Sequence, residues 1–174
     1  MTQDAAVDAS LAILELESPV EVVERTAHIE RAHPSLTSRQ PVLLVESDFR
    51  SAVTISRVFR ELQLLDDLII AADCENALVR LKQDQGARPA MILLDLDMPR
   101  MSALSFLKLI KEDVGLRLIP VVALAESNQA EDVAACYELG AAGYLVKTGD
   151  YSELLAKIRA VCGYWALSCL PAAY

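Results

Sequence analysis

The stretch MILLDLDMPRMSAL, residues 91–104, decides the fold, because an apolar run ends there in two acids and a Met-Pro turn follows at once. It contains one of five such runs, each followed by a longer stretch with helical periodicity: VLLVE (42–46), LIIAA (68–72), AMILLD (90–95), IPVVAL (119–124) and GYLV (143–146). Runs that are continuously apolar, rather than alternating, indicate parallel strands that are buried on both faces. The pattern therefore predicts a doubly wound α/β domain with a five-stranded parallel sheet.

Residues typical of helix ends lie between these runs. Asp48, Asp73 and Ser127 occupy positions where N-caps are expected. Gly140 lies where the helix before the last strand needs a left-handed residue at its end. The last helix is expected over residues 151–162.

The chain also has segments outside this domain. Residues 1–33 are predicted to form a helical extension, because Ser18, Pro19 and Glu21 have the spacing of an N-cap, a first helical residue and a capping box. Residues 34–41 contain two prolines and three hydroxyl residues and are interpreted as a linker. The main domain is then 42–162, followed by an apolar tail over 163–174.

Composition restricts the classes of partner. The 174 residues carry a formal net charge of −9, which disfavours nucleic acids and anionic membranes. No apolar run reaches the roughly 18 residues that a membrane-spanning helix needs. The four cysteines form no CxxC pair and no signal peptide precedes them, so we expect reduced thiols and a cytoplasmic location.

Three charged side chains are expected at one edge of the sheet. Functional crevices in such sheets lie at the carboxyl ends of the strands, where Glu46, Asp95 and Lys147 each follow or end a run. Carboxylates that face an ammonium suit a divalent cation and a phosphoryl group, since oxygen atoms hold the metal and the lysine compensates the phosphate charge. The alternative is that these residues are solvated turn residues.

Four segments, VLLVESD, MILLDLDMPRMSALSFL, LRLIPVVALAES and YELGAAGYLVK, resemble successive blocks of the receiver domain of two-component response regulators. The resemblance covers residues 42–162 and implies the flavodoxin-like strand order 2-1-3-4-5. It implies that Asp95 accepts a phosphoryl group from a histidine kinase and that Lys147 contacts that group. It also implies a Mg²⁺ ion held by Glu46, by Asp95 and by the main-chain carbonyl of Asp97.

The sequence departs from the receiver pattern around this site. The second acid expected after the first strand is Ser47, so Mg²⁺ should bind weakly unless Asp97 or Asp48 supplies the missing charge. The hydroxyl residue that switches the loop after the fourth strand is replaced by Ala125. Tyr144 matches the aromatic switch residue, although a core role is equally consistent.

The residue after Lys147 also differs from the receiver pattern. The family has a proline there with a cis peptide bond, whereas this chain has Thr148. A cis bond before a residue other than proline costs about 3 kcal/mol, so a trans bond is expected.

Two functions of different classes follow. The first is a single-domain response regulator that is phosphorylated on Asp95 and signals by protein contact. The second is a pseudo-receiver that binds partners independently of phosphorylation. Asp95 and Asp97 also match the DxD pair of haloacid-dehalogenase-type phosphatases, but that family places the pair after its first strand, so we do not expect an enzyme.

The end of the chain points to a partner. IRAVCGYWALSCLP resembles the phytochrome-associated single-domain regulators, which carry a Tyr-Trp pair after the final helix, here Tyr164 and Trp165. This resemblance implies a light-sensing histidine kinase such as a bacteriophytochrome. The apolar side chains of the last helix and tail predict a homodimer, the alternative being that the tail folds back over its own domain or the N-terminal extension.

Overall fold

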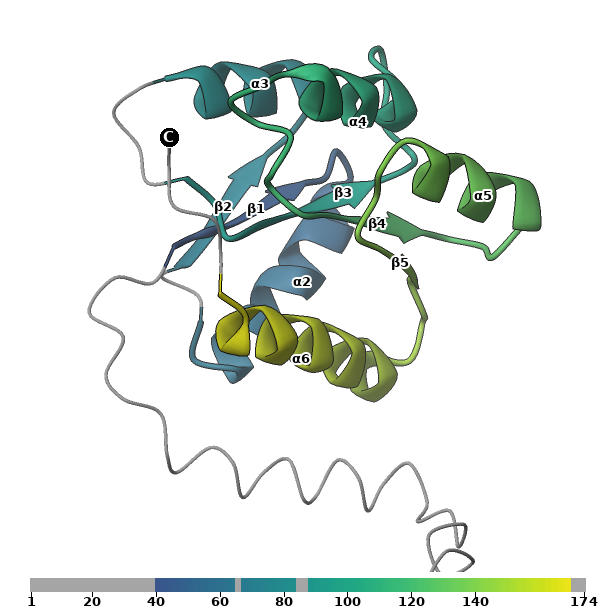
Figure 1. Cartoon of the computed structure of the whole chain (residues 1–174). Coiled ribbons are helices and arrows are strands. Elements are labelled where there is room, and N and C mark those ends of the chain that lie inside the picture. The colour runs from purple at the N-terminus through teal and green to yellow at the C-terminus, as the bar shows by residue number, and fades with distance from the viewer. Residues whose placement is uncertain (1–39, 65–66, 84–87, 170–174) are drawn as a thin grey trace, which may run out of the picture. The chain divides into compact units, whose positions relative to one another are not determined.

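The sheet predicted from the five apolar runs is present in the computed structural model, which describes residues 40–64, 67–83 and 88–169. Its strands are parallel, in the order β2-β1-β3-β4-β5 (Figure 1). The strands are β1 (Val42–Val45), β2 (Leu68–Ala71), β3 (Met91–Asp95), β4 (Val121–Ala125) and β5 (Gly143–Val146). The helices are α2 (Phe49–Glu61), α3 (Cys74–Lys82), α4 (Ala103–Glu112), α5 (Ala130–Glu138) and α6 (Tyr151–Leu167).

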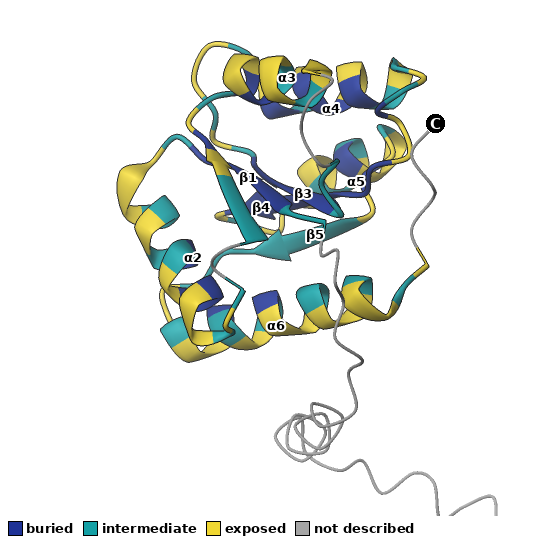
Figure 2. Cartoon of the chain, turned by 90° about the vertical axis from the view of Figure 1, so that its left-hand side faces the viewer, coloured by how far each residue is buried: buried dark blue, intermediate teal, exposed yellow. Residues whose placement is uncertain are grey.

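Helices cover both faces of the sheet, as the unbroken apolar runs require (Figure 2). Successive strand residues point to opposite faces, so each strand contributes to two separate clusters. Leu43, Ile92 and Val121 belong to the cluster under α3, α4 and α5, where Phe106 is fully buried. The neighbouring residues of the same strands belong to the cluster under α2 and α6: Val42, Leu44, Met91, Leu93, Val122 and Leu124.

The helix ends follow the predictions at three of four positions. Asp48 and Asp73 each accept a hydrogen bond from a backbone N–H of the first helical turn, at 2.7 Å. Gly140, which follows the C-cap residue Leu139 of α5, has a φ of 88°. The prediction for Ser127 was wrong, because α5 begins after Gln129, which makes no side-chain capping bond.

The last helix is longer than predicted. It continues to Leu167 instead of ending at Cys162, and Gly163 lies within it. Trp165 packs against the cluster under α2 and α6, which holds the additional turn on the domain. The predicted extension over 1–33 lies outside the described residues. Among the helices that are described, none is long and apolar enough to cross a membrane.

Candidate functional site

Strand register brings four charged residues to one edge of the sheet. Val45 of β1 pairs with Leu94 of β3, so the next residues, Glu46 and Asp95, lie side by side. Ala125 of β4 pairs with Val146 of β5, and the residues that follow them are Glu126 and Lys147. The carboxyl ends of four neighbouring strands therefore meet at a single site.

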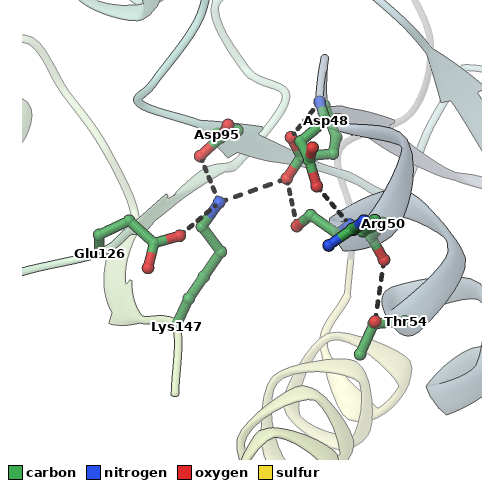
Figure 3. A network of polar contacts seen from close by, with 8 residues as sticks. Asp48, Arg50, Thr54, Asp95, Glu126 and Lys147 are labelled. Carbon is green, nitrogen blue, oxygen red and sulfur yellow. Dashed lines mark hydrogen bonds and ion pairs between the residues drawn. The ribbon is translucent and has the colours of Figure 1, made fainter. Parts of the chain in front are cut away.

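The ammonium of Lys147 lies at the centre of this site. Its Nζ is 2.8 Å from Asp95 Oδ1, 3.1 Å from Glu126 Oε1 and 3.4 Å from Glu46 Oε2 (Figure 3). Burial alone would lower the pKa of Lys147, but the neighbouring carboxylates outweigh burial and raise it. The lysine is therefore a permanent positive charge at neutral pH.

Asp95 is the buried acid at the end of β3, with 2% of its surface exposed. Its Oδ1 lies at ion-pair distance from Lys147 but accepts no hydrogen bond of acceptable geometry. Burial raises the pKa of Asp95, Lys147 partly offsets the increase, and the charge of Glu46 adds to it. The structure thus places a carboxylate oxygen without a hydrogen bond next to a fixed cation, an arrangement that suits a nucleophile receiving an anionic group.

Glu46 is held more firmly than Asp95. Its Oε1 accepts a hydrogen bond from the backbone N–H of Asp48 at 2.9 Å, and its Oε2 accepts one from Ser51 Oγ at 2.6 Å. The sequence analysis did not single out Ser51. Its place in the first turn of α2, five residues after Glu46, is the signal that could have identified it.

The fit of a metal ion to these residues is partial. No group of three or more Asp, Glu, His or Cys side chains in the described part of the chain is arranged to hold a metal. Glu46 and Asp95 supply two buried carboxylates, while Ser47 adds no charge and the side chain of Asp97 is exposed. Mg²⁺ in proteins is commonly held by one or two carboxylates together with water and phosphate oxygens, so two carboxylates suit weak binding.

The loop after β4 differs from the receiver pattern in a way that the sequence analysis did not anticipate. Ala125 has no hydroxyl group to offer, but the next residue, Glu126, contacts Lys147. The hydroxyl of Tyr144 donates a hydrogen bond to the carbonyl of Ser127 at 2.8 Å, which ties β5 to this loop. Tyr144 also packs against the apolar cluster, as a core role requires, and its role as a switch stays a prediction. The loop borders a pocket of about 390 Å³.

The chain after Lys147 adopts the expected trans peptide bond, since no cis bond occurs among the described residues. Thr148 Oγ1 accepts a hydrogen bond from the N–H of Asp150 and donates one to Glu153. Asp150 is in turn the N-cap of α6. The turn is therefore organised by the hydroxyl of Thr148 where the family has proline.

The two aromatic residues predicted for an interface differ in exposure. Their rings contact edge to face, with centroids 5.0 Å apart. Tyr164 is 64% exposed, whereas Trp165 is half-buried against its own domain. The position of Trp165 therefore agrees with the alternative that the end of the chain folds back over its own domain. Tyr164, in contrast, is available for contact with another chain.

Comparison with known proteins agrees with this geometry. Residues 42–159 match the response regulator receiver domain, and the chain belongs to that family. Response regulator Rcp1 of Synechocystis is 33% identical over 137 residues, which cover 76% of this chain and 93% of Rcp1.

Solved structures extend the comparison. The phosphorylated cyanobacterial phytochrome response regulator RcpA has a TM-score of 0.70 at 26% identity, covering 78% of this chain and all of RcpA. The Mn²⁺-bound form of Rcp1 has a TM-score of 0.67 at 32% identity, covering 76% of this chain and 99% of that one. The receiver fold and the similarity to phytochrome response regulators, both expected from the sequence, are confirmed.

Proposed function

We propose that Asp95 is the phosphoacceptor of a two-component response regulator and that a histidine kinase supplies the phosphoryl group. The observation that carries the proposal is the buried Asp95 carboxylate, whose Oδ1 accepts no hydrogen bond and lies 2.8 Å from Lys147 Nζ. In the transfer, an Asp95 oxygen forms a bond to phosphorus while the bond from phosphorus to the kinase histidine nitrogen breaks. The electron pair of the broken bond stays on that nitrogen, and the product is an acyl phosphate.

Lys147 and the neighbouring acids have separate roles in this proposal. Lys147 offsets the negative charge that the phosphoryl oxygens bring. Glu46, Asp95 and the main-chain carbonyl of Asp97 are the proposed Mg²⁺ ligands. When bound, the ion would neutralise charge on the phosphoryl oxygens.

Phosphoryl incorporation from acetyl phosphate and from purified kinases tests the proposal. We expect intact-mass measurements to show one added phosphoryl group on the native chain and none on Asp95→Asn. The matched control is Asp97→Asn, which removes an exposed carboxylate two residues away and should retain incorporation. Labelling that persists in Asp95→Asn would place the site elsewhere.

The second candidate is a pseudo-receiver that binds partners without phosphorylation. It is favoured by one contact, the ion pair of Glu126 with Lys147, because that carboxylate already occupies a donor that a phosphoryl group needs. Absence of labelling with every donor, including the physiological kinase, would favour this alternative over the first.

We infer the partner and setting from the relatives. The proteins RcpA and RPA3017 are described as a phytochrome response regulator and as a response regulator in red light signalling of R. palustris. A bacteriophytochrome kinase is therefore the proposed phosphodonor, in the cytoplasm, with output through protein contact and no catalysis by this chain. A panel of sensor kinases, ranked by the initial rate of transfer, tests the choice.

We also propose that the chain forms a homodimer through α6. Tyr164 and Leu167 are exposed on the last turns of this helix, at 64% and 67%. Large apolar residues on one exposed surface are favoured at interfaces, and symmetric dimers are the commonest assemblies.

A further inference from the structure

The ammonium of Lys147 is already shared by three carboxylates. An ammonium has three N–H donors, and three carboxylates, those of Asp95, Glu126 and Glu46, lie within 3.4 Å of this one. A phosphoryl group on Asp95 would bring three more acceptor oxygens with about two negative charges, while the carboxylate loses its own charge, so the site would gain about one negative charge. The phosphoryl oxygens would therefore compete with the carboxylates of Glu46 and Glu126 for this ammonium.

The three carboxylates differ in how easily they can move. Asp95 carries the phosphoryl group and is fixed by the strand. Glu46 is buried and held by two further hydrogen bonds, from Asp48 and Ser51. Glu126 is 67% exposed at its side chain and has no other hydrogen-bond or ion-pair partner among the described residues. Glu126 is thus the carboxylate that can leave at least cost.

Release of Glu126 would reach the neighbouring loop directly. Ser127 is the next residue, and its carbonyl accepts the hydrogen bond from the Tyr144 hydroxyl. The pocket beside the loop is lined by Glu126, Ser127 and Tyr144, among others, and provides space for rearrangement. Because Ala125 lacks a hydroxyl, no side chain at that position can draw the loop toward a phosphoryl oxygen. The negative phosphoryl oxygens would instead repel the Glu126 carboxylate and so push the loop away from Asp95.

We propose that Glu126 is a positioning residue that holds Lys147 until the phosphoryl group displaces it, and that this displacement transmits phosphorylation to the Ser127–Tyr144 contact. The proposal rests on the role of Asp95 as phosphoacceptor. It assigns two effects to Glu126: competition for Lys147, which slows phosphorylation, and coupling of the site to β5.

The competition is tested with acetyl phosphate and Mg²⁺, using the full chain. An Asp95 oxygen bonds to phosphorus and acetate leaves, so the initial rate of mass increase reports the reaction. We expect Glu126→Gln to raise this rate by about two- to fivefold, the range set by the strength of an exposed ion pair. The matched control is Asp132→Asn, which removes an acid that lines the same pocket without contacting Lys147. It should react at the native rate.

The possible results separate this proposal from the role of Asp95. If the native chain and Glu126→Gln are labelled at equal rates, or if Asp132→Asn is accelerated as much as Glu126→Gln, the competition is refuted while Asp95 remains the acceptor. If none of the proteins is labelled by acetyl phosphate or by any of the kinases, both proposals fail together. If Glu126→Gln is labelled and the native chain is not, Glu126 blocks Lys147 completely in the native chain, which supports the competition.

Coupling is tested by a spectroscopic signature that a general change in stability does not produce. Phosphorylation of the native chain should shift the backbone amide resonances of Ser127 and Tyr144, and the shifts should be smaller in Glu126→Gln. Asp132→Asn should give the native shifts. Equal shifts in the native chain and Glu126→Gln would refute the coupling.

Discussion

Glu46 and Asp95 are the buried charged residues of the described core, and the ammonium of Lys147 lies between them. With Glu126, three carboxylates share one cation, so the site carries excess negative charge before any phosphoryl group arrives. Burial of such charge without full compensation lowers stability. The charged site therefore lowers the free energy of unfolding of the protein.

Asp95→Asn should stabilise the protein in the absence of Mg²⁺. Because the pKa of Asp95 is raised in the folded state, ionisation of Asp95 destabilises the fold fully above that pKa; the effect decreases as the pH falls below it and is absent below the pKa of the unfolded state. We expect the free energy of unfolding at pH 7 to rise by about 1 to 2 kcal/mol, since Lys147 keeps two carboxylates. Urea denaturation measures the change. Exposed Asp97→Asn should have no effect, and a less stable Asp95→Asn would contradict the argument.

Ser47→Asp should tighten Mg²⁺ binding by adding a third acid beside Glu46 and Asp95. We expect about tenfold, because lost hydration offsets most of the added Coulomb attraction. Calorimetric titration of the native chain and the variant measures the difference. Ser47→Asn, which changes size without charge, is the control and should bind as the native chain does. Equal affinity in Ser47→Asp would mean that another acid already completes the site.

At the scale of helices and strands, two glycines differ in backbone conformation: one is left-handed and the other is helical. Gly140 has a φ of 88°, in the left-handed region, and an added Cβ would lie 3.4 Å from the Lys111 side chain. Gly163 lies inside α6, and a Cβ there would meet nothing within 4 Å. The same substitution should therefore have opposite effects at the two positions.

Gly140→Ala should destabilise the protein by about 1 kcal/mol or more, since alanine is strained in this conformation. Gly163→Ala should stabilise it by about 0.5 to 1 kcal/mol, since alanine is the better helix former. Thermal unfolding of the two variants in parallel measures both. Two shifts of the same sign would show that one of the backbone assignments is wrong.

The elements show which parts of the structure the sequence could predict. Five continuous apolar runs identified the strands, and parallel pairing then placed Glu46, Asp95 and Lys147 at one edge. The end of α6 was missed because the packing of Trp165 against the domain, which supports the last turn, is a tertiary contact that the local sequence pattern does not specify. The contact of Glu126 was missed because its reach depends on the side-chain conformation, which strand patterns do not specify.

At the scale of the whole molecule, the proposed dimer is tested through α6. Tyr164→Ser combined with Leu167→Ser should shift the protein toward monomer in light scattering at micromolar concentration. Trp165→Ala should do so as well, but it also removes packing within the domain. The double variant therefore gives the cleaner result. A native chain that is monomeric at the highest soluble concentration would exclude the dimer.

The site also has a consequence for how labelling experiments are interpreted. Glu46 and Lys147 are 101 residues apart in the chain yet share a hydrogen bond. Contacts of such separation form only when the intervening strands have assembled, because closing a long loop has an entropic cost. A nascent chain that has not completed β5 contains Asp95 but no ammonium beside it. With Asp95 as the proposed acceptor, phosphoryl incorporation should therefore report the fraction of chains that have finished folding.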